Sequence, residues 1–210
     1  MSKVLVFGAG GRAGRAAVVE ACRRGIEVKA AVRDPAKYAD LAADGVEVVA
    51  GDVTDPAEVA RLAEGNDAVI AAVYDGNADQ AAFFAAAARA LVEGLMKAGV
   101  DRLVWVGLAS TLGTESGALL MDTPGYPQQY RSFYLAHAAG AEVLAESELD
   151  WLVIAPAGDF EHAHPDRTGS YRAAPGEAAS RISYADFGIA LVDEAVAARH
   201  HRTRLGVEAG

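Results

Sequence analysis

Residues 3–20, KVLVFGAGGRAGRAAVVE, decide the fold. Val4 to Phe7 form a short apolar run, typical of a buried parallel strand, and the last eight residues have the pattern of a helix. Four glycines lie between these two patterns, at positions 8, 10, 11 and 14. Glycine is needed where a chain turns tightly or where its backbone approaches another group closely. The stretch therefore predicts a strand, a tight turn and a helix.

The spacing of these glycines fits two related patterns. Gly8-x-x-Gly11-x-x-Gly14 is the spacing of short-chain dehydrogenases, and Gly8-x-Gly10-x-x-Ala13 fits the general dinucleotide-binding fingerprint. The glycines let the backbone approach a pyrophosphate, and the helix N-terminus offers it free N–H groups and a partial positive charge. We therefore expect this loop to bind a dinucleotide through Gly8, Gly10, Gly11, Arg12, Ala13 and Gly14.

The residues after the second expected strand, 27–32, bear on which dinucleotide is bound. NAD-specific sites usually have an acid at the end of this strand, where it holds the ribose hydroxyls. Here the strand is followed by Arg33, and Asp34 comes one position later. Because guanidinium groups bind phosphate bidentately, Arg33, with Arg12 and Lys37, favours NADP(H) over NAD(H). The alternative is that Arg33 is merely exposed and that Asp34 holds the ribose.

The charge distribution also suggests a small anionic ligand. The whole chain has a formal net charge of −10, which argues against nucleic acid as a partner. Residues 1–37 nevertheless contain eight Lys or Arg against three Asp or Glu. Such local positive charge suits a phosphate-bearing ligand, although chance clustering on solvated helix faces would give the same count.

Composition excludes several other classes of protein. Hydrophobic residues make up 52% and charged residues 23% of the 210 residues, as in ordinary globular domains. The sequence has no apolar stretch near the roughly 20 residues that span a bilayer, and no signal-peptide pattern at its start, so we expect no membrane association. The single cysteine, Cys22, cannot form an internal disulfide, which favours the cytoplasm.

Strand and helix patterns alternate along the chain. The apolar runs are nearly continuous, as in parallel strands covered on both faces, and the repeated β-α units predict a single α/β domain over 1–210 with a Rossmann-type, doubly wound parallel sheet. A capping box at 77–80 is expected to open the Ala-rich helix. Strands are expected at 4–7, 27–32, 46–49, 67–73, 102–106, 151–155 and 204–207, and helices at about 12–24, from 35 (short), 56–64, 80–97, 132–147 and 184–198.

Two long segments, 107–131 and 156–180, lack a regular pattern. They follow the expected fifth and sixth strands at the carboxyl edge of the sheet, where such folds bind ligands. Long loops in a compact domain are usually functional or mobile, so we expect these two to form the substrate side. Further cofactor contacts are expected from Asp52 and Val53 after the third strand and from Ala72, Val73 and Tyr74 after the fourth. Asp52 could equally be an ordinary loop residue.

The usual machinery for ketone reduction is absent. Short-chain dehydrogenases normally carry Tyr-x-x-x-Lys, in which the lysine lowers the pKa of the tyrosine so that it can protonate a carbonyl oxygen. None of the seven tyrosines has a lysine four positions later. Tyr134 is the best placed, but Ala138 stands where the lysine would be needed.

Several stretches together carry a family resemblance: VFGAGGRAG, AAVRDPAK, GDVTDP, AGVDRLVWVG, SELDWLVIAPAGDF, RTGSYR and SRISYADFGIALVDE. With them, essentially the whole chain resembles the atypical short-chain dehydrogenase/reductases with an NmrA-like NAD(P)H-binding domain, in particular the NADH-flavin reductase group. The animal biliverdin-IXβ and flavin reductase is a more distant relative. The resemblance implies hydride transfer from NAD(P)H to a flavin- or quinone-like acceptor, without a Tyr-Lys pair.

The resemblance also implies residues on the substrate side. In the animal relative a histidine in the helix before the sixth strand lines the pocket, and an ungapped alignment puts His137 there, where it could equally be packed in the core. A hydroxyl after the fifth strand usually faces the nicotinamide, and Ser110 or Thr111 would supply it. Tyr134 and the aromatic residues near it could stack on a flat substrate or pack the loop onto the sheet. The candidate catalytic residues are Ser110, Tyr134 and His137.

Other functions remain open at this point. His162 and His164 lie close together, but they have no third ligand at a familiar spacing, so we expect no metal. The missing Tyr-Lys pair also fits a non-catalytic sensor that binds NADP(H) and reports its redox state to a partner protein. A pathway-specific reductase or isomerase of secondary metabolism is a third possibility. Either a monomer or a homodimer is compatible with the sequence.

Overall fold

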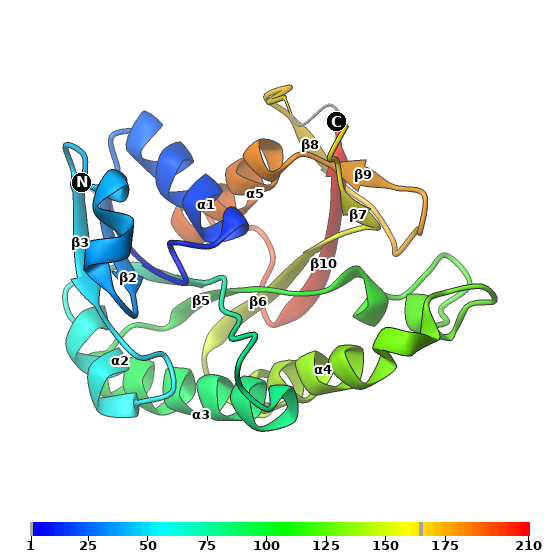
Figure 1. The fold of residues 1–210 in the computed structure, drawn as a ribbon, viewed down its shortest axis with the longest axis horizontal. Helices are drawn as coiled ribbons and strands as arrows, with labels where there is room; N and C mark the ends of the chain where they lie inside the picture. Colours follow the sequence, from blue (N-terminus) through cyan, green and yellow to red (C-terminus); the bar gives the residue numbers. More distant parts are fainter. Residues whose placement is uncertain (1, 164–165) are drawn as a thin grey trace.

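A computed structural model describes residues 2–163 and 166–210 (Figure 1). In this part of the chain, one sheet has the strand order β3-β2-β1-β4-β5-β6-β10-β8, in which all neighbouring pairs are parallel except β10 and β8. Its strands are Lys3–Phe7 (β1), Glu27–Val32 (β2), Val46–Ala50 (β3), Ala68–Ala71 (β4), Arg102–Val106 (β5), Asp150–Pro156 (β6), Thr203–Ala209 (β10) and Tyr171–Ala173 (β8). The order reverses between β1 and β4, so the predicted Rossmann-type, doubly wound sheet is confirmed.

Helices cover both faces of the sheet. Figure 1 shows α1 and α5 on one side and α2, α3 and α4 on the other. β1 explains why both layers are needed, because its side chains alternate between two cores: Val4 and Val6 pack beneath α1 and α5, while Leu5 and Phe7 pack beneath α2 and α3. The helices are Arg12–Arg23 (α1), Pro56–Ala63 (α2), Gln80–Ala98 (α3), Arg131–Ala145 (α4) and Tyr184–Val196 (α5), with a 3₁₀ segment at Pro35–Leu41 (η1).

The helix ends follow local chemistry, with one departure from expectation. The Asp55 side chain caps α2 by accepting from Ala57 and Glu58 backbone N–H groups, ahead of Pro56 at the first position. In α3, however, the capping residue is Asp79, which accepts from the N–H of Ala82 at 2.9 Å. The predicted capping box starting at residue 77 is therefore wrong. Gln80, the other residue of the expected capping box, instead donates its side-chain amide N–H groups to the backbone carbonyls of Asp75 and Ala78 in the preceding loop.

The two long segments contain more structure than their sequence suggested. Short 3₁₀ turns occur in 107–131 at Ala109–Thr111, Leu120–Asp122 and Gln128–Tyr130. In the second segment, Asp159–Phe160 (β7) pairs with Arg181–Ile182 (β9), and β8 pairs antiparallel with β10. The prediction that 156–180 is wholly irregular is thus wrong. Pairing with β8 also explains why β10 extends beyond the expected 204–207.

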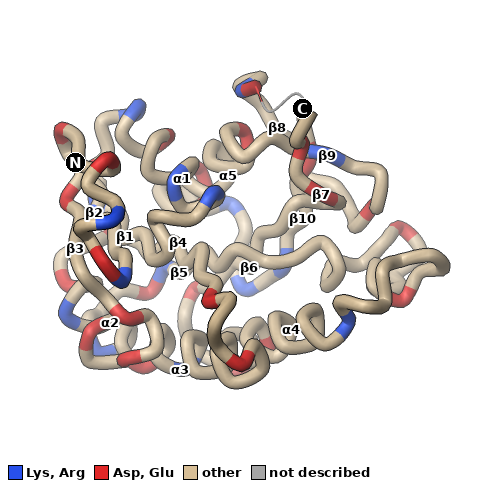
Figure 2. The backbone as a smooth tube through the Cα atoms, in the orientation of Figure 1, with Lys and Arg blue, Asp and Glu red and all other residues tan. Residues whose placement is uncertain are grey.

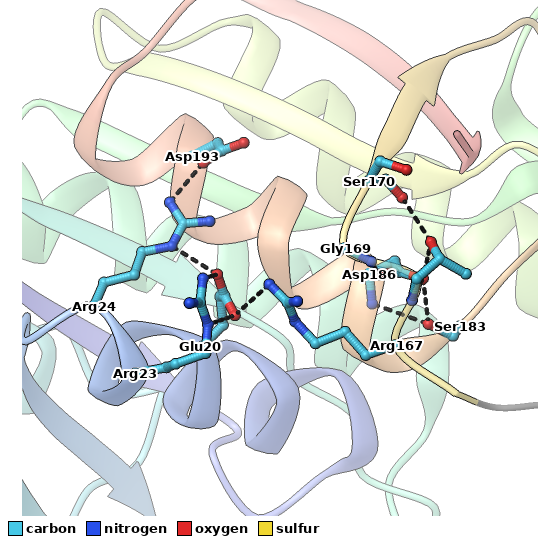
Figure 3. Close-up of polar contacts among 10 residues, drawn as sticks. Glu20, Arg23, Arg24, Arg167, Gly169, Ser170, Ser183, Asp186 and Asp193 are labelled. Carbon is cyan, nitrogen blue, oxygen red and sulfur yellow. Dashed lines mark hydrogen bonds and ion pairs between the residues drawn. The ribbon is translucent and has the colours of Figure 1, made fainter.

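A carboxylate on α1 contacts the middle of the second segment, at Arg167 (Figure 3). Glu20 is almost fully buried and accepts hydrogen bonds from Arg23 and Arg24, and Arg167 reaches it at 3.4 Å. The hydrogen bonds from Arg23 outweigh the effect of burial and, together with Arg24, lower the pKa of Glu20 to about 2. Arg24 also bonds to Asp193, so this cluster joins α1, α5 and the segment beyond β7.

A second carboxylate, on α5, holds the same segment. Asp186 is fully buried and accepts from the backbone N–H groups of Thr168 and Gly169 and from the hydroxyl of Ser183 (Figure 3). Burial acts to raise the pKa of Asp186, but these donors outweigh it and hold the pKa below its usual value. The segment is therefore tied to both helices on this face of the sheet.

Candidate functional site

The glycine loop lies at the carboxyl end of β1, between β2 and β4, where the strand order reverses. Gly8 has φ +73°, and a Cβ added there would lie 2.1 Å from the carbonyl oxygen of Ala72, after β4. A Cβ on Gly14, in the first turn of α1, would lie 2.2 Å from the carbonyl oxygen of Gly8. Both distances are far below van der Waals contact. Glycine is therefore required for the turn and for the close approach of α1.

The other two glycines have different roles. A Cβ on Gly10 would lie 2.3 Å from Cε1 of Tyr38, whose ring, from η1, covers the loop. Sequence reasoning missed Tyr38, and the only signal for it was an aromatic residue in the short helix after the second strand. At Gly11 a Cβ would meet Gly8 at 3.4 Å, which is an ordinary contact. Gly11 instead caps α1 without a side chain.

The N-terminus of α1 is open to an anion. Neither a capping side chain nor an acidic residue accompanies its first turn, which contains Arg12, Ala13 and Gly14. The first N–H groups of a helix lack intrahelical partners, and the helix dipole favours negative charge at this end. The Arg12 guanidinium lies over the ring of Tyr184, 4.9 Å from its centroid, next to this turn. Such a helix end suits a phosphate group.

Basic side chains near the expected adenosine end already have acidic partners. Arg33 bonds to Asp75 at 2.6 Å and Lys37 lies 3.4 Å from Asp34. In Figure 2, Lys or Arg and Asp or Glu are interspersed around α1, β2 and β3 and do not form one basic patch. Arg33 and Lys37 thus each pair with a nearby acid, and their convergence with Arg12 on a phosphate stays a prediction. The Asp34 side chain also caps η1, which limits its use as a ribose ligand.

The remaining cofactor candidates divide into two groups. Ala72 and Val73 lie against Gly8, and the exposed Tyr74 follows them, so these three belong to the same edge as the loop. The hydrogen bonds of Asp52 and the packing of Val53 involve residues other than those of the glycine loop. The Asp52 carboxylate accepts from the N–H and hydroxyl of Thr54, and Val53 is buried in the core beneath α2 and α3. For Asp52 the structure favours the alternative of an ordinary loop residue.

The two candidate hydroxyls after β5 differ in their hydrogen bonds to the described residues. Thr111 donates to the carbonyl of Leu108 at 2.9 Å. Ser110 is 1% exposed, and its hydroxyl has no hydrogen-bond partner among the described residues. A buried polar group without a partner is costly and calls for an explanation. A ligand group bound at this edge of the sheet would supply the partner.

His137 does not have the environment expected of a proton donor. It is 5% exposed, and its ring lies 4.4 Å from Phe84, 5.8 Å from Trp105 and 6.3 Å from Phe133, measured between centroids. Burial lowers its pKa to about 4, so the imidazole is neutral at pH 7. The structure therefore favours the alternative of a packed core residue.

Tyr134, on α4, packs with two aromatic residues of the first long segment. Its ring centroid lies 5.6 Å from that of Tyr126 and 6.5 Å from that of Tyr130. Burial, followed by the neighbouring Tyr134 and Asp159, raises the pKa of Tyr126 to about 12, and burial also raises the pKa of Tyr134. These shifts are opposite to the one that a lysine produces in a Tyr-Lys pair.

The second long segment adds an aromatic stack. Phe160 stacks on Tyr184, with centroids 3.8 Å apart and planes 13° from parallel. Burial raises the pKa of Tyr184, Arg12 opposes this shift and Asp159 adds to it. Asp159, on the second long segment, thus acts electrostatically on Tyr126 of the first segment and on Tyr184 of α5. The segments after β5 and β6 therefore approach each other, and Figure 1 shows both at the same end of the molecule.

Neither a metal cluster nor a membrane span is evident in the part of the chain that the structure describes. Within residues 2–163 and 166–210, no group of three His, Cys, Asp or Glu could hold a metal ion. His162 lies near Tyr184, while His164 is outside the described residues. No helix among the described residues is both long and apolar enough to cross a bilayer.

This sheet order, with a glycine turn and an open helix end at its reversal point, defines a Rossmann-type dinucleotide-binding protein. A family model described as NAD(P)H-binding matches residues 8–205. The chain belongs to this NAD(P)H-binding family, and the predicted relationship to NmrA-like, atypical short-chain dehydrogenases is confirmed.

Relatives of known sequence or structure extend over nearly the whole chain. YwnB of Bacillus subtilis (strain 168) is 32% identical over 221 residues, which cover 98% of this chain and 97% of YwnB. A Burkholderia pseudomallei crystal structure named "putative exported protein" is 36% identical, with a TM-score of 0.84, and covers 99% of this chain and 100% of its own. A "putative NADH-flavin reductase" from Streptococcus pneumoniae TIGR4 is 28% identical, with a TM-score of 0.81 and complete coverage of both chains.

Proposed function

We propose that this protein is an NADPH-preferring reductase that transfers hydride to a flavin- or quinone-like acceptor. The observation that carries the proposal is the uncapped N-terminus of α1, held against the end of β4 by Gly8 and Gly14. Membership of an NAD(P)H-binding family supports the cofactor class, and the name of the Streptococcus pneumoniae relative supports the acceptor class.

The nicotinamide cofactor would supply the hydride, and the protein would bind and orient it. The first turn of α1 and Arg12 would hold the pyrophosphate, and Arg33 the 2′-phosphate. The nicotinamide would lie toward β4 and β5, near Ala72 and Ser110. The buried hydroxyl of Ser110, which has no hydrogen-bond partner among the described residues, would then bond to the nicotinamide or to the acceptor.

The protonation states of the substrate-side residues suit this chemistry. At neutral pH His137 is an unprotonated imidazole, and the raised pKa of Tyr134 makes that phenol a weak acid. A flavin or quinone spreads the negative charge left by hydride transfer over its ring system, so a strong acid beside the ring is not required. Binding and orientation over the nicotinamide would supply much of the acceleration. Tyr126, Tyr134 and Phe160 offer aromatic surface for a planar acceptor.

The test is a comparison of reduced nicotinamide oxidation with NADPH and with NADH, using FMN, riboflavin and a small quinone as acceptors. Turnover with at least one acceptor, at a higher kcat/KM for NADPH than for NADH, is the expected result. The Ser110→Ala variant shows whether turnover uses the proposed site. Failure to bind either nucleotide would refute the proposal.

A non-catalytic NADP(H) sensor is the second candidate. It is favoured by one relative, the nitrogen metabolite regulation-like protein bik4 of Gibberella fujikuroi, which is 31% identical over 150 residues, or 64% of this chain and 43% of bik4. Tight NADPH binding without turnover on any acceptor would support the sensor. The pathway-specific reductase or isomerase, the cytoplasmic location and the choice between monomer and homodimer stay predictions.

A further inference from the structure

The ion pair between Arg33 and Asp75 crosses the carboxyl end of β1. Arg33 follows β2 and Asp75 follows β4, and these two strands are the neighbours of β1 on its two sides. Ala31 of β2 and Ala71 of β4 are both in register with Phe7, the last residue of β1. Adjacent strands lie about 4.8 Å apart, so the pair reaches over the full width of β1. It therefore lies where the glycine loop begins.

A bound dinucleotide has to occupy the same edge. In doubly wound sheets the adenosine ribose lies at the end of the second strand, and the cofactor crosses the end of the first. A 2′-phosphate at this ribose would need the guanidinium of Arg33, but Asp75 already holds it at 2.6 Å. Two further cations on this side are also paired: Lys37 with Asp34, and Arg15 with Asp40.

We propose that Asp75 is a specificity-determining residue, which competes with the 2′-phosphate of NADPH for Arg33. NADH has no 2′-phosphate and so does not compete with Asp75 for the Arg33 guanidinium, whereas the 2′-phosphate of NADPH binds that guanidinium only after an exchange of partners. Asp75 thus reduces the preference for NADPH that Arg33 alone would give. This inference rests on the proposed function, because it requires NAD(P)H to bind at the glycine loop.

The exposure of the Arg33 side chain makes the exchange feasible. This side chain is 67% exposed and that of Asp75 is 21% exposed, so water screens the guanidinium end of the pair and weakens it. A phosphate carries more charge than a carboxylate and offers more acceptor oxygens to a guanidinium. Asp75 therefore adjusts the affinity for NADPH and does not block its binding.

Asp75→Asn removes the charge with little disturbance of the loop. The other carboxylate oxygen of Asp75, Oδ1, accepts from the backbone N–H of Asn77 at 3.0 Å. An asparagine keeps an acceptor oxygen at this position, so the turn after β4 can persist. The matched control is Asp44→Asn, which removes one negative charge from an exposed residue. Asp44 lies just before β3, at the amino end of this strand, whereas the proposed site lies at the carboxyl ends of the strands.

The experiment measures the dissociation constants of NADPH and NADH by titration calorimetry for the wild type, Asp75→Asn, Arg33→Ala, the double variant and the Asp44→Asn control. We expect Asp75→Asn to tighten NADPH binding by about twofold to fivefold, with NADH binding unchanged. Arg33→Ala should weaken NADPH binding and abolish the effect of Asp75→Asn in the double variant. Asp44→Asn should leave the ratio of the two constants unaltered.

Two results would overturn the inference while leaving the proposed function standing. One is an unchanged NADPH-to-NADH ratio in Asp75→Asn. The other is an equal loss of affinity for NADPH and for NADH in Asp75→Asn, which would mean that the Arg33–Asp75 pair helps to hold the bound cofactor. If the wild type binds neither nucleotide, the proposed function fails as well.

Discussion

At the scale of single residues, two neighbouring hydroxyls after β5 can be told apart by their hydrogen bonds. Ser110→Ala removes a buried hydroxyl that has no hydrogen-bond partner among the described residues, so we expect the free energy of unfolding to stay within about 0.5 kcal/mol of the wild type. If the hydroxyl bonds to the bound nicotinamide or acceptor, kcat/KM should fall by about tenfold. Urea unfolding and steady-state kinetics measure the two effects.

Thr111→Val is the matched control, because it also deletes one hydroxyl. Its loss leaves the Leu108 carbonyl without this donor and should cost about 1 kcal/mol of stability, with a smaller effect on turnover than Ser110→Ala. The reverse pattern of turnover would assign the nicotinamide contact to Thr111.

His137 predicts a pH dependence of stability. Its pKa is about 4 in the folded protein, below its ordinary value of 6.5, so the unfolded chain binds a proton first as the pH falls. Stability linked to this group is complete above pH 6.5 and is lost as the pH falls toward 4, by up to roughly 3 kcal/mol. His137→Phe, which keeps a ring among Phe84, Trp105 and Phe133, should lose less stability between pH 7.5 and 5. If urea unfolding shows that the wild type and His137→Phe lose the same stability over this pH range, the burial of a neutral imidazole is contradicted.

At the scale of elements, the turn between β1 and α1 gives a sharp contrast between two glycines. An alanine at position 14 would bring its Cβ to 2.2 Å from the Gly8 carbonyl, so α1 would have to shift, at about 1–3 kcal/mol, and NADPH binding should weaken. An alanine at position 11 meets the same carbonyl at 3.4 Å and should cost less. Thermal unfolding and nucleotide titration of both variants test this. If the two variants lose the same stability and the same affinity for NADPH, then Gly14 is not needed for the close packing of α1.

The elements that the sequence predicted well are those whose pattern follows from burial on both faces. The central strands are continuous apolar runs, and α2 has a capping Asp55 followed by proline, so local sequence specified them. β8 escaped prediction because its three residues, at the sheet edge, are largely exposed and depend on pairing with β10. Asp79 was missed as the cap of α3 because the nearby Asn77 offered a similar side chain.

At the scale of the whole molecule, the contacts missed at the site link segments far apart in the chain. Arg33 pairs with a residue 42 positions away, and Glu20 contacts Arg167, 147 positions away. Local patterns contain no information about such partners. The same holds for His137, whose neutral state follows from burial against α3 and β5. The cofactor loop could thus be predicted from sequence, but the charge state and pairing of the side chains around it could not.

The Glu20 cluster joins α1, α5 and the segment after β7, so its loss should affect global stability. Glu20→Gln leaves Arg23, Arg24 and Arg167 gathered around a neutral side chain, and because the arginines are partly exposed we expect a loss of about 1–3 kcal/mol at pH 7 in urea unfolding. Glu93→Gln, at an exposed position of α3, is the control and should change little.

The acid range provides the stronger test of this cluster. The pKa of Glu20 is about 2 in the folded protein, below its ordinary value of 4.5, so its contribution to stability is complete above pH 4.5 and is lost as the pH falls toward 2. The wild type should therefore lose more stability than Glu20→Gln over this interval, and the two should converge at its lower end. If the difference between them is the same at pH 7 and at pH 2.5, the carboxylate charge is not what holds α1, α5 and the segment together.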